Sequence, residues 1–392
     1  MGIFIFLNPF THTTAIKEIC FYLSLFIVLL LICFKKIDFS FKSPLTLPFA
    51  LFTLWVFIGL FFALYKENSI HDFYAHLLKY IAIYYILINF FNSRKRLIVL
   101  SWIIIISVAI FSIGGTIYFY LILGNDILVR ILFKDMSMNT VGFFAIPSIL
   151  LSLHILARER KFYIKLILLI SLVGTSFVTL LAQSRGTLLG MVFSLFVLFP
   201  KNKKVLIVFF LCLAIAVGFM PTPIKNRIIP VVTFDVPALQ NDGRIKVWCT
   251  YLEIIKEYPI IGTGFGMEMW QHQDLWDKYL NRVSPERRIF KLDPHNMLVS
   301  TITRLGLVGL ALFLYIIFTF FGMSWVTIKH GKDDFIKSWG LCITATFIAY
   351  FIQGMFEEAA SHVPAIVLYT IFAMMTILWR IDSESNSRIL QN

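Results

Sequence analysis

Charged residues are scarce in this 392-residue chain: Asp, Glu, Lys and Arg make up 15% of it, whereas 59% is hydrophobic and 41 residues are phenylalanine. So little charge excludes a soluble domain, whose surface must stay wet. About 20 apolar residues span a bilayer. Eleven runs have this length or are somewhat shorter: 16–34, 45–64, 75–91, 97–123, 139–157, 162–182, 188–199, 205–220, 304–326, 335–355 and 362–380. The sequence therefore predicts an all-α, polytopic membrane helix bundle with about 11–12 transmembrane helices.

Cysteine is equally sparse. The five cysteines are scattered and follow neither a disulfide framework nor a metal-ligand spacing. Without internal repeats or a low-complexity linker, the chain reads as a single integral membrane domain, 1–392. Its opening segment, MGIFIFLNPF, lacks the basic region and the cleavage site of a removable signal peptide. We interpret it as the stub of a twelfth helix or as a shortened gene start.

The net charge of +13 gathers in short alternate loops, at 35–42, 92–96, 158–161, 200–204 and 329–332. This distribution argues against a nucleic-acid partner, and the positive-inside rule makes these loops cytoplasmic. The same alternation places five segments on the external face: 65–74, 124–138, 183–187, 221–294 and 356–361. We therefore expect a multi-pass protein surrounded by membrane lipid.

Segment 221–294 is the large external loop, and we predict an amphipathic helix within it. The stretch GRIKVWCTYLEIIKEYP has Asp242 available as a cap and Pro259 to end the run. Its apolar residues at helical spacing are Trp248, Tyr251, Leu252 and Ile255. The following PIIGTGFGMEMW (259–270) lacks the spacing of a dinucleotide fingerprint, so we expect a tight turn that returns the chain to the membrane.

Arg244 falls in the first turn of this predicted helix. Free backbone N–H groups and the positive end of the helix dipole already favour an anion there. Arg244 therefore either joins a bound anion or pairs with Asp242 or Glu253 on a solvated face.

His295 lies in KLDPHNMLVSTITRLGLVGL (291–310). Asp293 can cap a helix, Pro294 suits its first position, and His295 would fall in the first turn. The helix dipole disfavours the protonated imidazole, which would stay neutral near pH 7 and able to accept a proton. The alternative is a capping or interfacial histidine.

Arg185 stands between two apolar runs in LLAQSRGTLLG (180–190). The run from Gly186 to Phe199 has 14 residues, which is about 21 Å of helix against a hydrocarbon core of about 30 Å. Because a basic loop fixes the far end, Arg185 should lie below the outer headgroup plane. A guanidinium at that depth usually faces a polar cavity, and the alternative is a snorkelling side chain.

Arg185, Arg244 and His295 therefore belong to one external face. Guanidinium groups suit phosphate oxygens, and a neutral histidine can take a proton from a hydroxyl. The combination fits group transfer from a lipid-linked phosphate donor. We predict no metal site and no cofactor, because the acidic residues of this face look isolated or lack identifiable partners: Glu67, Asp72, Glu357 and Glu358.

In these segments the chain resembles the O-antigen ligase and O-antigen polymerase superfamily of bacterial envelope glycosyltransferases. The matching pieces are QSRG at 183–186, GRIKVW at 243–248, PIIGTGFG at 259–266 and HNMLVSTITRLGLVGL at 295–310, in the family's order. The resemblance is dense from about 180 to 310. It implies about twelve transmembrane helices with a large periplasmic loop, in the bacterial inner membrane.

The resemblance implies that Arg185 and Arg244 engage the undecaprenyl diphosphate of a glycan donor, and that His295 activates the acceptor hydroxyl. In ligases the acceptor is a lipid A-core sugar, and transfer is inverting and metal-independent. Two features depart from the family pattern: the first helix is short, and Arg304 stands where many relatives carry an acidic residue.

We favour a ligase over a polymerase, which uses the same donor but a second lipid-linked glycan as acceptor. A protein O-oligosaccharyltransferase is disfavoured, because the chain ends soon after Arg380. A transporter of lipid-linked glycans would typically show repeats or paired broken helices. A structural scaffold remains the third class.

Overall fold

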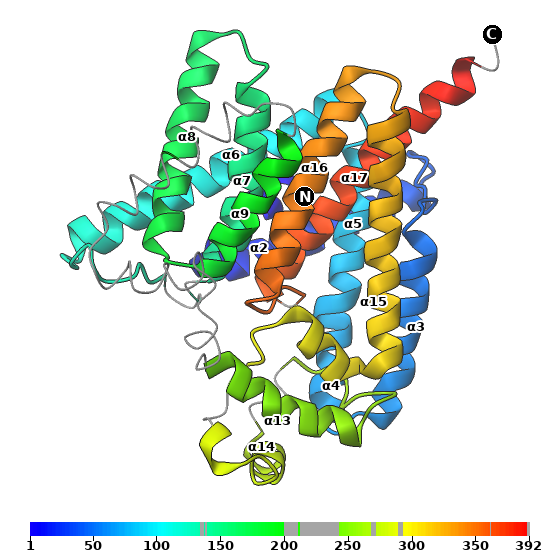
Figure 1. Ribbon diagram of the computed structural model, residues 1–392. Coiled ribbons are helices and arrows are strands. Elements are labelled where there is room, and N and C mark those ends of the chain that lie inside the picture. Colours follow the sequence, from blue (N-terminus) through cyan, green and yellow to red (C-terminus); the bar gives the residue numbers. More distant parts are fainter. Residues whose placement is uncertain are drawn as a thin grey trace.

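A computed structural model describes residues 1–133, 137, 139–199, 211, 243–267, 272–288, 293–360 and 362–389 of the chain (Figure 1). The predicted span at 205–220, the predicted cap Asp242 and much of the predicted loop 221–294 lie outside these residues, apart from Leu211. Every regular element within the described ranges is a helix. This confirms the all-α class predicted from the sequence.

The described helices follow one another along the chain in a fixed order. They are α1 (Gly2–Leu7), η1 (Thr11–Thr13), α2 (Thr14–Cys33), α3 (Thr46–Phe62), α4 (Lys66–Asp72), η2 (Phe73–Leu78), α5 (Lys79–Phe90), α6 (Arg94–Thr116), η3 (Ile117–Ile122), α7 (Val141–Leu156), α8 (Phe162–Leu181), α9 (Arg185–Leu198), α13 (Gly243–Glu257), α14 (Gln273–Leu280), η5 (Pro285–Arg287), α15 (Met297–His330), α16 (Asp334–Gly354) and α17 (His362–Ile389). Both η2 and η3 are π-helical, and η1 and η5 are 3₁₀ turns.

Ten of the eleven predicted apolar runs coincide with helices of the structure. Among the described residues, seven helical segments are long and apolar enough to cross a membrane. Three shorter apolar helices, α3, α7 and α9, accompany them. The chain is thus a polytopic membrane bundle.

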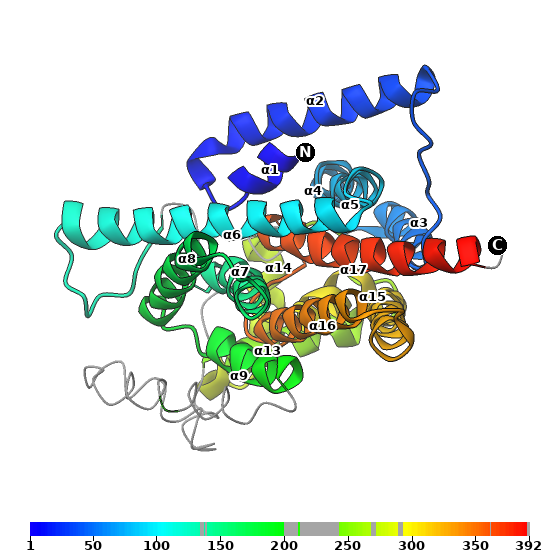
Figure 2. The ribbon, with the colours of Figure 1, turned by 90° about the horizontal axis from the view of Figure 1, so that it is seen from above.

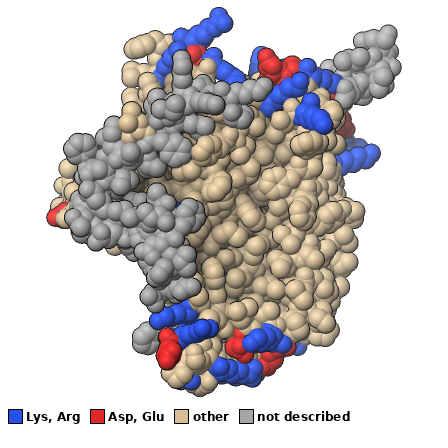
Figure 3. Space-filling model, viewed as in Figure 1, with Lys and Arg blue, Asp and Glu red and all other residues tan. Residues whose placement is uncertain are grey.

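Charged side chains gather at the two ends of the bundle, and the face seen in Figure 3 has a broad uncharged band between them. Two contacts join basic loops predicted to share one side. Arg94 forms an ion pair with Asp333 at 2.5 Å, and Arg380 donates to the backbone carbonyls of Ser40 and Lys42. We call this the basic end, and the opposite one the α13 end.

Helix α17 occupies the middle of the bundle, and α2 lies at its edge (Figure 2). In the apolar windows of these helices, 83% of the α17 residues are buried but only 17% of those in α2. Glycine permits close packing between α9 and α16. If Gly190 of α9 carried a Cβ atom, that atom would lie 2.6 Å from the Ala349 carbonyl oxygen of α16, closer than a side chain allows. Helix α9 is therefore fixed directly against α16.

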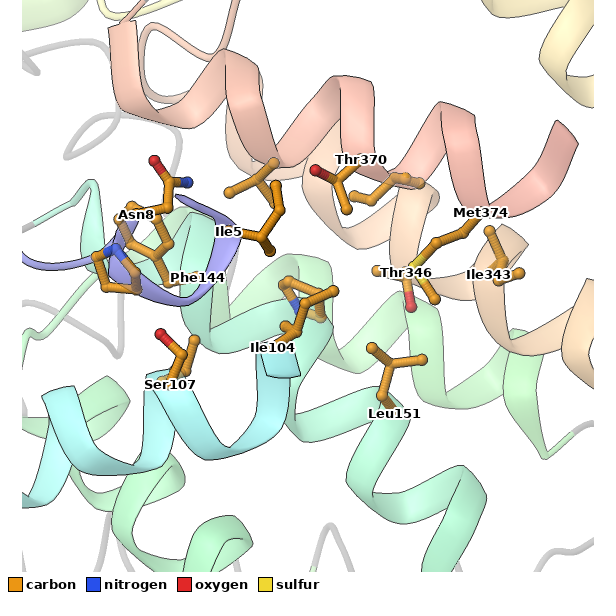
Figure 4. Close-up of a pocket in the computed structure, with 15 residues that line it drawn as sticks. Ile5, Asn8, Ile104, Ser107, Phe144, Leu151, Ile343, Thr346, Thr370 and Met374 are labelled. Carbon is orange, nitrogen blue, oxygen red and sulfur yellow. The ribbon is translucent and has the colours of Figure 1, made fainter. Parts of the chain in front are cut away.

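The opening segment forms the six-residue helix α1. Phe4 is buried, and Asn8 contacts the backbone of Val363 in α17. Beside α1 lies a cavity of about 30 Å³, lined mostly by apolar side chains from α1, α6, α7, α16 and α17 (Figure 4). Its small volume and apolar lining offer little to a polar substrate.

At the α13 end, helices α4, α13 and α14 form a layer beneath the bundle (Figure 1). The predicted turn at 259–264 docks onto α15, which breaks at Gly306 (φ 67°). There Leu307 N donates to the Pro259 carbonyl at 2.8 Å, and Gly264 N donates to the Arg304 carbonyl at 3.0 Å. A Cβ at Gly306 would lie 2.0 Å from the Ile260 carbonyl oxygen, so this approach requires glycine.

Candidate active site

His295 precedes α15 rather than lying in its first turn. The side-chain oxygen of Asn296 accepts from Leu298 N at 2.9 Å and from Val299 N at 3.1 Å, which makes Asn296 the cap. The prediction that Asp293 caps this helix is therefore wrong. Asp293 Oδ1 instead accepts from His295 N at 2.6 Å, and His295 adopts a left-handed backbone conformation with φ 47°.

The imidazole of His295 contacts a buried carboxylate. Its Nδ1 lies 3.3 Å from Oε1 of Glu357, whose Oε2 accepts from Asn139 Nδ2 at 2.8 Å. Burial lowers the pKa of His295, but the hydrogen bond to Glu357 and the charges of Glu357 and Asp293 outweigh it and raise the pKa above 6.5. The prediction that a helix dipole depresses this pKa is therefore wrong, because a carboxylate provides the dominant field.

Arg244 is the second residue of α13, in the first turn as predicted. Its guanidinium lies over the ring of Phe356, 5.8 Å from the centroid, and its charge acts to lower the pKa of His295. Trp248 Nε1 donates to the Pro294 carbonyl at 2.7 Å and so ties α13 to the segment before His295. Arg244 and His295 thus lie within electrostatic range of each other.

The buried face of α13 differs from the predicted one. Leu252 is 52% exposed, whereas Tyr251 is buried against Trp276 of α14. The four buried residues of the helix are Val247, Thr250, Tyr251 and Ile254. The helix therefore packs one position away from the predicted stripe.

Arg185 is the first residue of α9, one position before the predicted run begins at Gly186. The start of α9 packs against the segment that follows α16, since a Cβ on Gly186 would lie 2.6 Å from Gln353 Oε1 and 2.9 Å from Phe356 Cβ. Residues 353–358, called here the 353–358 segment, thus contact the start of α9, the Arg244 guanidinium and the His295 imidazole. This segment therefore links Arg244 and His295 with the start of α9, the helix that Arg185 begins.

A cavity of about 510 Å³ opens beside the 353–358 segment. Its lining includes hydroxyl groups, carboxylates and one ammonium group, from Thr11, Thr14, Lys17, Thr140, Asp293 and Glu357. Arg185, Arg244 and His295 are not among its lining residues. His295 adjoins the cavity through Asp293 and Glu357, the two lining residues that it contacts.

Arg304, the departure from the family pattern, is buried beside Phe265. It is 2% exposed, and its guanidinium lies 5.2 Å from the ring centroid of Phe265. Burial raises the pKa of Glu358 to about 7, and the positive charge of Arg304 acts in the opposite direction. Glu358 and Arg304 therefore lie within electrostatic range of each other.

Sequence reasoning missed Glu357 as the partner of His295. A second omission is Arg130, which donates to the Ala182 carbonyl at 2.6 Å and to Asn139 Oδ1 at 3.3 Å. The sequence feature that could have revealed Glu357 is its position beside Glu358, in a short loop between two apolar runs. Polar groups so close to a membrane span are usually functional.

Asp72 is not isolated, contrary to the prediction. Its Oδ1 lies 3.0 Å from His71 Nδ1 and 3.5 Å from His76 Nε2. His272 stacks on the ring of Tyr65 with centroids 3.4 Å apart.

Comparison with protein families finds a match in the middle of the chain. Residues 166–314, which include Arg185, Arg244 and His295, match the protein family described as O-antigen ligase. No curated protein matches the chain. Members of the family are membrane glycosyltransferase-type enzymes of O-antigen biosynthesis that use lipid-linked glycans. Residues 166–314 are thus similar to the O-antigen ligase family, and this match supports the resemblance of the chain to the O-antigen ligase and O-antigen polymerase superfamily.

Proposed function

We propose that this protein is an O-antigen ligase-type glycosyltransferase of the bacterial inner membrane. It would transfer a glycan from undecaprenyl diphosphate to a sugar hydroxyl of lipid A-core, with its active site on the periplasmic face. The observation that carries this proposal is the contact between His295 Nδ1 and Glu357 Oε1 at 3.3 Å, beside the 510 Å³ cavity.

His295 is proposed as the general base. If Nδ1 donates its proton to Glu357, the lone pair of Nε2 remains free to accept a proton. That nitrogen takes the proton of the acceptor hydroxyl while the oxygen bonds to the anomeric carbon of the donor. The bond from that carbon to the diphosphate breaks, and the diphosphate leaves with the electron pair. Because the base supplies the activation, the mechanism needs no metal.

Arg185 and Arg244 are proposed to hold the diphosphate. Each stands in the first turn of a helix, α9 or α13. Exposed backbone N–H groups and the helix dipole favour anions at such positions, and guanidinium groups add bidentate hydrogen bonds to phosphate oxygens. The N-termini of α9 and α13, both facing the 353–358 segment, would stabilise the negative charge that develops on the departing diphosphate.

The 510 Å³ cavity is proposed to receive the acceptor sugar. Its lining mixes hydroxyl groups with the carboxylates of Asp293 and Glu357, and these groups can exchange hydrogen bonds with sugar hydroxyls. Asp293 and Glu357 also contact His295, so a hydroxyl bound there would approach the base. The ammonium of Lys17 adds a cation that suits a phosphorylated or acidic acceptor.

Reconstitution tests this function against its alternatives. Purified protein in liposomes should convert undecaprenyl-diphosphate glycan and lipid A-core into glycosylated lipid A-core, detected by mass spectrometry. A longer glycan on undecaprenyl diphosphate, with lipid A-core unchanged, would identify a polymerase. Movement of donor lipid between leaflets without any transfer would identify a transporter and contradict the proposal.

Glu357 provides a pH-dependent prediction. In the wild type the acid limb of the pH–rate profile should have its midpoint above 6.5, because the pKa of His295 is raised and the base works only when deprotonated. Glu357→Gln removes the negative charge, so the midpoint should move to lower pH. The maximal rate should also fall by at least about tenfold, because the imidazole is no longer oriented by a carboxylate.

The matched control is Glu67→Gln, which removes an exposed carboxylate from α4 at the same end of the bundle. Its pH–rate profile should coincide with that of the wild type. A midpoint that stays in place in Glu357→Gln would show that this carboxylate does not govern the base.

A further inference from the structure

Three metal-ligating side chains meet at the junction of α4 and η2. Asp72 Oδ1 lies 3.0 Å from His71 Nδ1 and 3.5 Å from His76 Nε2. One ligand atom from each of the three residues lies within 4.8 Å of the other two. We infer that His71, Asp72 and His76 form a binding site for zinc or a similar divalent transition metal.

The backbone here explains why two histidines five positions apart share one face. Residues Phe73–Leu78 form the π-helix η2, directly after α4. Its i→i+5 hydrogen bonding widens the turn, so residues five apart come nearer to alignment than in an α-helix. Short π-helical segments of this kind frequently occur at functional sites. The local distortion thus brings His76 back toward His71.

The contacts around the cluster orient the ligand atoms. Asp72 is 3% exposed, and its Oδ2 accepts from Met267 N at 2.6 Å, which leaves Oδ1 toward the two imidazoles. Tyr80 OH lies 3.3 Å from His76 Nδ1, on the far side of that ring from Asp72. Metal-binding histidines and carboxylates typically have outer hydrogen-bond partners of this kind, which fix ring orientation and tautomer.

The distances and the donor atoms favour zinc. A tetrahedral ion with metal–ligand bonds of about 2.0 Å has ligand atoms about 3.3 Å apart, and the two observed separations of 3.0 and 3.5 Å bracket that value. Two imidazole nitrogens and one carboxylate oxygen suit zinc better than calcium or magnesium, which prefer oxygen ligands. The His71 side chain is 58% exposed, so the ion can enter from solvent and a water can complete the coordination.

A metal at this position would stabilise the layer that carries Arg244. Asp72 already holds Met267, and Ser69 Oγ accepts from Gly266 N at 3.0 Å. The ion would fix this end of the turn that follows α13. This inference concerns the architecture of the α13 end and does not depend on the proposed transfer reaction.

Zinc binding to the full-length protein in detergent, with any polyhistidine tag removed, tests the site. Competition with a chromophoric chelator should show one zinc ion per chain in the wild type. His71→Gln should weaken zinc binding at least about tenfold, because one of three ligands is lost. Because His71 is largely exposed, the His71→Gln variant should fold normally. In the presence of chelator its melting temperature should equal that of the wild type. The matched control, His330→Gln, removes an exposed histidine at the basic end of α15 and should bind zinc like the wild type.

Thermal unfolding gives a second readout on the same variants. Zinc should raise the melting temperature of the wild type and of His330→Gln relative to chelator, since a ligand that binds only the folded state stabilises it. His71→Gln should show a reduced shift at the same zinc concentration. Equal zinc affinity in the wild type and His71→Gln would overturn the inference, as would a wild type that binds no zinc.

Discussion

Replacing His295 with alanine is expected to abolish glycan transfer while leaving the donor bound. A general base typically contributes about 10²- to 10⁴-fold to a rate, so turnover should fall by about that factor. The diphosphate would still meet Arg185 and Arg244, and the donor affinity should change little. Single-turnover assays with labelled undecaprenyl-diphosphate glycan measure the rate, and equilibrium binding of the same lipid measures affinity.

His272→Ala provides the matched control for this experiment. His272 also lies at the α13 end, but its ring stacks on Tyr65 rather than contacting Glu357. Its loss should leave the transfer rate within a small factor of the wild type. If His295→Ala transferred glycan at the wild-type rate, the base would have to be another group and the proposed mechanism would fail.

Exchanging either arginine for lysine is expected to remove much of the activity although the charge is kept. A guanidinium presents a planar fork that matches two phosphate oxygens, whereas an ammonium acts as a point charge. Loss of one bidentate contact should lower kcat/KM by about tenfold or more in Arg185→Lys and in Arg244→Lys, which corresponds to about 1.4 kcal/mol. Steady-state kinetics in proteoliposomes measure both variants.

Arg287→Lys serves as the control, because Arg287 is an exposed arginine at the same end of the bundle. It should retain wild-type kcat/KM. Full activity in both lysine variants would exclude bidentate binding by Arg185 and Arg244. Normal transfer in both Arg185→Ala and Arg244→Ala would exclude any part for these residues in the reaction and would favour a structural scaffold.

The helices were largely predictable because membrane crossing imposes a length and an apolar composition that the sequence displays directly. The start of α9 lies within one residue of the predicted one, and α13 was predicted from apolar residues at helical spacing in the external loop. The break in α15 did not. The sequence predicted a helix with His295 in its first turn and an apolar run at 304–326, but non-local hydrogen bonds from the turn at 259–264 interrupt α15 at Gly306.

The site was predictable only in part, for a related reason. Arg185, Arg244 and His295 stand out because charge or imidazole beside apolar runs is unusual. The contact between His295 and Glu357 could not be predicted, because Glu357 follows His295 by 62 positions. Only the packing of α16 and α17 brings these two residues together. Likewise, Asp293 and Asn296 are both good caps, and local sequence could not rank them. Asp72 looked isolated because an ordinary helix would not align His71 with His76.

The break in α15 holds the turn at 259–264 in place. At Gly306 the carbonyls of Thr303 and Arg304 lose their helical partners and accept instead from Thr263 N at 2.9 Å and Gly264 N at 3.0 Å. Lifting the turn away would strand these acceptors in apolar surroundings, at a cost of about 1–3 kcal/mol each. The turn at 259–264 is therefore expected to stay bound to α15. A route to the site that displaced this turn would carry that cost.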